Sequence, residues 1–193
     1  EEAYQPYAYM YQTGNAIGRY YGLVAEGFYQ QSDFKTDGTL SDGLPVNSFI
    51  KNPQPGDVKY KDLNKDGKID NYDYTYQLGS ELPEINYGFQ IGADYRNLGF
   101  NAYFQGVANK TVATALSSVY VPLAGGNKNI SKHYLKNYWS AERPSGKYPR
   151  LTTLDNANNY LNSQIWTEKG DFLKLRELEV YYRMRDLNFG KMK

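Results

Sequence analysis

The strongest constraint in this sequence is a strict alternation of apolar and polar residues along two adjacent segments. From Ile85 to Tyr95 every second side chain is Ile, Tyr, Phe or Ala, and the positions between them carry Asn, Gly, Gln or Asp. A strand points successive side chains to opposite faces, so this period of two predicts a β-strand with one apolar and one polar face. Residues 100–107, FNAYFQGV, repeat the pattern after a short connection at 96–99. The sequence therefore predicts a β-hairpin over 84–107.

Two architectures share this pattern. Two strands of about ten residues joined by a tight turn have the dimensions of a transmembrane β-hairpin, whose polar face lines a wet lumen. A hairpin of a soluble sandwich looks the same, with its apolar face in the core. The composition is that of a β protein in either case, with 21 Tyr and 18 Gly among 193 residues. We expect a mainly β fold of antiparallel strands and hairpins.

Composition and motifs exclude several classes of function. The net charge is +1, so no strong field favours nucleic acid as a partner. The sequence has no Cys and a single His, His133, which leaves no thiol nucleophile and little basis for a zinc site or a catalytic triad. No phosphate-binding or nucleophile-elbow motif occurs, and no apolar run is long enough for a spanning helix. We assign no catalytic residue and expect no enzyme activity.

The segment 62–73, DLNKDGKIDNYD, has the ligand spacing of an EF-hand calcium loop. Carboxylates and amides alternate because calcium prefers six to eight oxygen ligands, while Gly67 at position 6 allows the sharp turn and Ile69 at position 8 anchors the loop on apolar neighbours. The predicted ligands are Asp62, Asn64, Asp66, Lys68 through its backbone carbonyl, Asp70 and Asp73.

Three features qualify this calcium prediction. Asp73 stands at position 12, where a longer Glu is usual, so we expect modest affinity. The flanks do not form two long helices, which favours a structural clip over a regulatory switch. The alternative is an acidic, solvated loop held only by Asx turns.

The remainder of the chain divides by composition. Residues 131–140 predict a short helix, and 171–184 predict a strand with an irregularity near Leu175. The expected organisation is a strand and polar loop at 1–54, the acidic calcium-type loop at 55–75, the hairpin at 84–107, a long loop at 108–170, and a strand and turn at 171–193.

Four segments together resemble the SusC/RagA-type TonB-dependent outer-membrane transporters. They are GRYYGLVAEGFYQ at 18–30, the run from QPGDVKYKDLNKDGKIDNYD to the hairpin at 54–107, NYWSAERPSGKYPRL at 137–151 and GDFLKLRELEVYY at 170–182. The acidic run followed by PEINYGF is the specific part of the likeness. The sequence departs from the family at Lys65, where Gly is common.

The resemblance implies a 22-stranded barrel in the bacterial outer membrane, in contact with lipid and plugged by an N-terminal domain. Such a receptor imports glycan- or peptide-derived nutrients with energy from TonB, under a lid formed by a SusD-like lipoprotein. The acidic loop and residues 108–170 would then be extracellular, and 96–99 a periplasmic turn. The chain would be a C-terminal piece of a longer receptor, because its strands are too few to close a barrel.

Two other hypotheses remain open from the residues alone. One is a secreted, calcium-stabilised β-sandwich that binds carbohydrate through surface tyrosines and tryptophans. It would bury Phe89, Ile91 and Phe104, whereas a barrel wall exposes them to lipid. The other is a dockerin-like adhesion module, which requires a second acidic loop, and the sequence contains only one.

Overall fold

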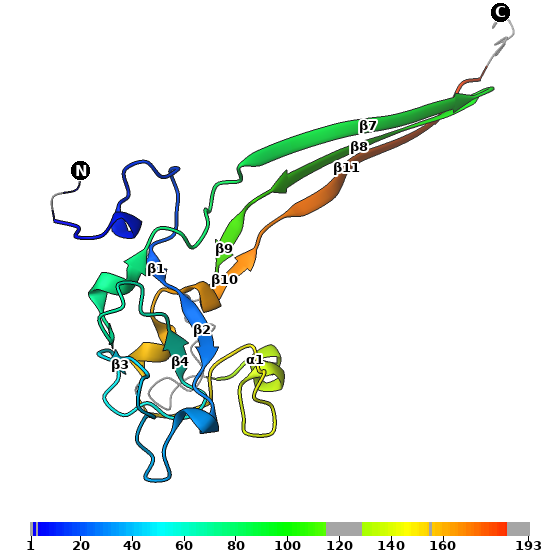
Figure 1. The fold of residues 1–193 in the computed structure, drawn as a ribbon. Coiled ribbons are helices and arrows are strands. Elements are labelled where there is room, and N and C mark those ends of the chain that lie inside the picture. Colours follow the sequence, from blue (N-terminus) through cyan, green and yellow to red (C-terminus); the bar gives the residue numbers. More distant parts are fainter. Residues whose placement is uncertain (1, 3, 115–128, 155, 185–193) are drawn as a thin grey trace, which may run out of the picture. The chain divides into compact units, whose positions relative to one another are not determined.

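The computed structural model describes residues 2, 4–114, 129–154 and 156–184 (Figure 1). The chain forms two compact units, which we treat separately. The loop unit comprises Glu1–Leu82 and Thr111–Glu168, and the strand unit comprises Pro83–Lys110 and Lys169–Lys193. The turn predicted within 186–193 lies outside the described residues. No helix in the described ranges has the length and apolar character needed to cross a bilayer.

The strand unit is a three-stranded antiparallel sheet in the order β11-β8-β7. Its strands are β7 (Ile85–Tyr95), β8 (Leu98–Ala108) and β11 (Phe172–Tyr182), drawn as three long arrows side by side in Figure 1. The predicted hairpin is confirmed, and its turn consists of two residues, since Tyr95 pairs with Leu98. Arg96 in that turn has a φ of 54°, as tight hairpin turns require.

One face of this sheet is apolar along all three strands. Residues directly opposite in antiparallel strands share a face. Phe89 lies opposite Phe104, with ring centroids 4.9 Å apart, and Leu175 lies opposite Phe104 from the other side. Within this unit no second layer covers the stripe: Phe89 is 43% exposed and Ile91 is 53% exposed. The predicted alternation is therefore confirmed, and its apolar side is uncovered within this unit.

The opposite face is polar, and side-chain hydrogen bonds on it link one strand of the sheet to another. The Tyr181 hydroxyl donates to Asp94 at 2.7 Å, and Arg176 Nε donates to Gln105 at 2.9 Å. Arg176 is the extra residue of a register shift between Leu175 and Glu177. This shift confirms the irregularity predicted near Leu175 and keeps the apolar set on one face beyond it.

The loop unit is built from short strand pairs and single helical turns rather than from a large sheet. Antiparallel pairs join β1 to β6 and β2 to β4, β3 runs parallel to β5, and β9 pairs with β10. The helix predicted within 131–140 is confirmed as α1. The strands are β1 (Gly22–Leu23), β2 (Ala25–Phe28), β3 (Val46–Asn47), β4 (Val58–Tyr60), β5 (Lys68–Ile69), β6 (Tyr74–Thr75), β9 (Thr111–Ala113) and β10 (Thr167–Lys169). The helical elements are η1 (Ala8–Met10), η2 (Gln31–Asp33), η3 (Asn71–Asp73), α1 (Lys132–Asn137), η5 (Ala157–Tyr160) and η6 (Gln164–Trp166).

Two small apolar clusters form the core of the loop unit. The first contains Leu23, Val58, Tyr60 and Ile69, all fully or almost fully buried. The second is a stack of aromatic rings from Tyr134, Tyr148 and Trp166. Because these clusters are small, buried polar contacts must complete the interior.

The central polar contact is the carboxylate of Asp57, which is completely buried. Its Oδ1 accepts hydrogen bonds from Arg150 Nε at 2.7 Å, Asn156 Nδ2 at 2.9 Å and Asn159 Nδ2 at 3.0 Å. Its Oδ2 accepts from the backbone N–H of Gln54 at 2.9 Å. A buried charge is tolerated only when it is paired and fully hydrogen-bonded, and this one meets both conditions.

The segment around η5 is held to β4 by the same set of asparagines. Asn159 Oδ1 accepts from Val58 N–H at 2.8 Å, and Asn158 Nδ2 donates to the Val58 carbonyl at 3.1 Å. The two side chains thus imitate a neighbouring strand along β4. Trp166 Nε1 donates to the Asn159 carbonyl at 2.9 Å, which ties η6 to the same segment.

We predict that Asn159→Ala destabilises the loop unit by about 2 kcal/mol or more, because Val58 N–H and the Asp57 carboxylate each lose a buried partner. Asn162→Ala is the matched control, since Asn162 is exposed in the same segment and its change should stay within about 0.5 kcal/mol. Hydrogen exchange of the amides in 57–60 measures both effects. Equal protection in the two variants would contradict the role assigned to Asn159.

Candidate functional site

The acidic loop predicted to bind calcium connects β4 to β6, with β5 in its middle and η3 at its end. Its first half is curled by side chains that accept bonds from the loop's own backbone. Asp62 Oδ1 accepts from Lys65 N–H at 2.6 Å and Asp62 Oδ2 accepts from Gly67 N–H at 2.8 Å. Asp66 Oδ1 accepts from Lys68 N–H at 2.8 Å. The loop is therefore folded back on Asp62, the residue predicted as its first ligand.

The sharp turn expected at Gly67 is present. Gly67 has a φ of 83°, in the left-handed region that residues with a Cβ rarely adopt. Lys65 also lies there, with a φ of 62°. This is the position at which the SusC/RagA family commonly has Gly, so the departure seen in the sequence falls on a backbone conformation that Gly adopts most easily.

Asp73, the twelfth residue of the loop, is completely buried and closes the loop. Its Oδ1 accepts from Leu63 N–H at 2.7 Å and its Oδ2 accepts from Asp70 N–H at 2.8 Å. Burial raises the pKa of the Asp73 carboxyl, and the backbone hydrogen bonds oppose that shift. Asp73 thus joins the beginning of the loop to its end through its own two oxygens.

The middle of the loop is anchored on the rest of the loop unit. Ile69 is completely buried in the cluster of Leu23, Val58 and Tyr60, as predicted for position 8. The strand β5 that contains Ile69 pairs in parallel with β3, so that Val46 N–H donates to the Gly67 carbonyl at 2.9 Å. A second strand therefore supports this single loop from outside.

Tyrosines from the N-terminal segment cover the end of the loop. The Tyr9 hydroxyl donates to the Tyr72 carbonyl at 2.7 Å, and the Tyr7 ring stacks on Tyr9 with centroids 5.3 Å apart. Burial, followed by the negative charge of Asp73, raises the pKa of Tyr9 to about 12. Tyr9 is therefore a neutral hydrogen-bond donor at physiological pH.

The donor chemistry of the loop fits a hard cation such as calcium. All predicted ligands are oxygens, and each carboxylate retains lone pairs beyond the backbone bonds that it accepts. In the described ranges, no three carboxylate, imidazole or thiol groups are close enough together to hold a metal by themselves. The Asn64 amide, the Lys68 carbonyl and water would have to complete the coordination, so the calcium site stays a prediction.

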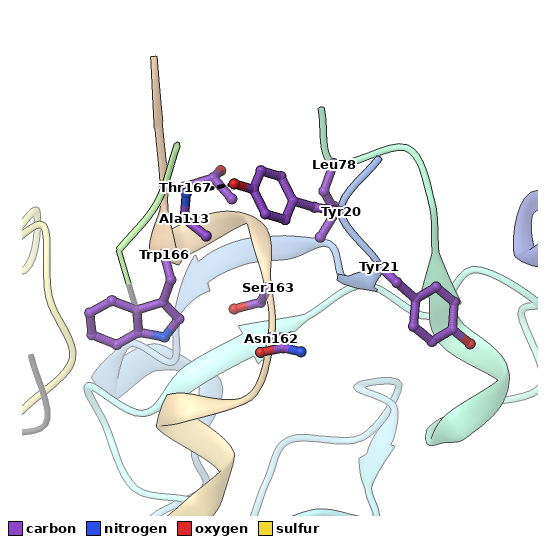
Figure 2. Close-up of a pocket in the computed structure, with 8 residues that line it drawn as sticks. All are labelled: Tyr20, Tyr21, Leu78, Ala113, Asn162, Ser163, Trp166 and Thr167. Atoms are coloured by element: carbon purple, nitrogen blue, oxygen red, sulfur yellow. Dashed lines mark hydrogen bonds between the residues drawn. The ribbon is translucent and has the colours of Figure 1, made fainter. Parts of the chain in front are cut away.

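Two hollows of the loop unit bear on ligand binding. The first, shown in Figure 2, has a volume of about 50 Å³ and is lined by residues that include Tyr20, Leu78, Ser163 and Trp166. Sites for drug-sized ligands usually measure about 300–1,000 Å³, so this cavity is too small for a sugar or a peptide. The second is an open hollow of about 340 Å³ beside Asp62, which leaves the acidic loop accessible from solvent.

Reasoning from the sequence missed the contacts centred on Asp57. In the sequence, the PGD run at 55–57 belongs only to the family likeness, and the asparagines at 156–159 fall in the long loop predicted at 108–170. The one available signal was the density of Asn in DNANNY, because repeated amides suit a buried polar contact surface. Nothing in the sequence assigned those amides to Asp57.

Comparison with known proteins gives a consistent result, although no family model matches the chain. TonB-dependent receptor P26 of Formosa agariphila is 30% identical over 149 residues, which cover 71% of this chain and 14% of that receptor. TonB-dependent receptor P3 of the same organism is 24% identical over 180 residues, which cover 93% of this chain and 16% of that receptor. In fold, the chain resembles a chain of the RagAB peptide importer in its open-open state, with a TM-score of 0.50, 17% identity, and coverage of 84% of this chain and 15% of that one.

These relatives and the β-stranded fold define the class of protein as a TonB-dependent receptor. The chain belongs to this family, and the SusC/RagA type that its motifs indicate stays a prediction. The chain spans about a seventh of the length of the curated relatives that it matches. Its described part is mainly β, with antiparallel strands and one short α-helix.

We predict that Asp73→Ala loosens the acidic loop even without a bound ion, because Leu63 N–H and Asp70 N–H lose their acceptor in a buried position. The cost should be about 2–6 kcal/mol, from about 1–3 kcal/mol for each of the two unsatisfied donors. Asp66→Ala is the comparison, since Asp66 is exposed and the Lys68 N–H that it releases can bond to water, so its loss should cost less than about 1 kcal/mol. Hydrogen exchange of residues 62–73 in chelator distinguishes the two variants, and identical exchange would refute the closing role of Asp73.

Proposed function

We propose that this chain contributes part of the barrel wall and the extracellular loops of an outer-membrane receptor that imports nutrients. The observation that carries the proposal is the exposed apolar stripe across β7, β8 and β11, found in a chain whose relatives are TonB-dependent receptors. A stripe of this kind fits hydrocarbon on one side of the sheet and a wet lumen on the other.

The dimensions of the sheet support this role. Each of its three strands has 11 residues, which corresponds to about 36 Å at about 3.3 Å per residue. A tilt of about 40° reduces this length to about 28 Å along the membrane normal, close to the ~25 Å apolar band of outer-membrane barrels. The outer edges of β7 and β11 are then positions at which further strands of the barrel would pair.

The secreted sandwich is the weaker alternative. It would have to bury Phe89 and Ile91, which are 43% and 53% exposed in the strand unit. It would also use tryptophan faces to stack on sugars, but Trp139 and Trp166 are both buried. Carbohydrate contacts in the loop unit would therefore depend on tyrosines.

The partners follow from the proposed receptor. We expect membrane lipid against the apolar stripe, a SusD-like lipoprotein lid over the loop unit, and energy from TonB through a plug domain. The imported ligand is expected to be a glycan or a peptide, and the likeness in fold to a peptide importer supports this class. The work of such a receptor is transport rather than catalysis, in keeping with relatives that are receptors.

We further propose that Asp62, Asn64, Asp66, Lys68, Asp70 and Asp73 hold a structural calcium ion. The support is the oxygen donor set, the left-handed Gly67 and the buried anchor Ile69. An ion would neutralise part of the charge gathered on this short loop and hold its exposed half against Asp73, which the backbone already fixes.

For the wall, we predict that Ile91→Arg destabilises the receptor folded in a bilayer by about 2–4 kcal/mol, the usual cost of a cation on the lipid face near the midplane. Gln90→Arg is the matched control, because the adjacent side chain lies on the polar face and the change should cost less than about 1 kcal/mol. Denaturant titration of the receptor in lipid vesicles measures both. Equal costs at the two positions would rule out a lipid-facing stripe.

For the loop, we predict that calcium binds with a dissociation constant of about 10⁻⁴–10⁻³ M, the range of extracellular calcium modules. The double variant Asp62→Ala/Asp66→Ala should abolish this binding, because it removes two carboxylate ligands at once. Asp42→Ala is the control, since Asp42 is an exposed carboxylate that pairs with Lys35 outside the loop. Isothermal titration calorimetry decides the question, and binding that survives the double variant would place the ion elsewhere.

A further inference from the structure

The acidic loop is joined to a distant part of the chain through strand β3. On one side, β3 is hydrogen-bonded to the loop: Val46 N–H donates to the Gly67 carbonyl at 2.9 Å, and Ser48 N–H donates to the Ile69 carbonyl at 3.0 Å. Between these two residues lies Asn47, whose side chain is buried. The loop backbone is therefore hydrogen-bonded to the two residues that flank Asn47, and the Asn47 amide between them is buried.

The Asn47 side chain connects β3 to the segment 156–166. Its Nδ2 donates to Asn158 Oδ1 at 2.9 Å, while its Oδ1 accepts from Phe49 N–H at 2.9 Å. Asn158 in turn donates to the Val58 carbonyl, and its own carbonyl accepts from the Tyr60 hydroxyl at 2.5 Å. The backbone bonds of β3 and the buried amide contact of Asn47 thus connect the acidic loop to Asn158.

Apolar packing provides a second connection between the same two parts. Ile69 of the loop is completely buried in the first core cluster. Leu161 and Ile165, from the segment 156–166, pack against that cluster. Because packed interiors resist small displacements, a shift of Ile69 must be accommodated at these neighbours.

We propose that the acidic loop at 62–73 and the segment at 156–166 form one cooperative unit, coupled through Asn47 and Ile69. A cation that orders the loop then also orders 156–166, and any partner that holds 156–166 increases the affinity of the loop for the cation by the same factor. The second part of this inference depends on the calcium loop proposed above. The first part, the coupling itself, does not.

Hydrogen–deuterium exchange on the full-length receptor tests the coupling in chelator, without any ion. Asn158→Ala should raise exchange in the loop 62–73 by about fivefold or more, the lower end of usual coupling strengths. Asn162→Ala, an exposed change in the same segment, should leave the loop unaltered. Faster exchange confined to 156–166 and its direct contacts on β4 would overturn the proposal.

If Asn158→Ala does not reach the membrane, Asn47→Asp replaces it. This variant keeps the acceptor for Phe49 N–H, removes the donor to Asn158 and sets a carboxylate against the Asn158 Oδ1 acceptor, so it breaks the contact. Under the proposal, exchange then rises at 156–166 as well as in the loop. A rise limited to residues 44–50 would contradict the coupling.

Adding calcium chloride to the unaltered receptor separates the two hypotheses. Slower exchange in both 62–73 and 156–166 supports an ion and a coupling. Slower exchange in 62–73 alone retains the ion site and overturns the coupling. If calcium alters neither segment, the ion assignment fails, and the result of Asn158→Ala in chelator still decides whether the two segments are coupled.

Discussion

The buried carboxylate of Asp57 is the interaction on which the loop unit most depends. Four donors converge on it, from Gln54, Arg150, Asn156 and Asn159, and it accepts them in a region that excludes water. Removing any one donor leaves charge or amide groups without a partner, which is far more costly than the net gain from a single hydrogen bond. The two apolar clusters are too small to fold these long connections alone, so this polar contact completes their packing.

The two units place their polar side chains in opposite ways. The strand unit keeps its apolar residues on one uncovered face and its polar residues on the other. The loop unit keeps amides and a carboxylate inside, because segments with little regular structure leave backbone groups that need partners. Val58 illustrates this, since both its N–H and its carbonyl are satisfied by asparagine side chains rather than by a strand.

The acidic loop shows how one calcium-type motif can be stabilised without a second copy. Its position-8 residue, Ile69, lies in the apolar core, and its β5 strand is supported by β3 instead of by another loop. The Asp73 carboxylate closes the loop by accepting hydrogen bonds from two of its backbone N–H groups. The protein's own hydrogen bonds therefore join the two ends of this loop.

The amino-acid sequence alone predicts the hairpin, its two faces, the irregularity near Leu175 and the spacing of the acidic loop, because each depends on residues a few positions apart. It also identified the family, through motifs that keep their order along the chain. Only the tertiary structure decided that β11 pairs with β8, that β3 supports the loop, and that Asp57 meets asparagines about a hundred residues away. Those contacts join distant segments, and no local periodicity encodes which amide reaches which carboxylate.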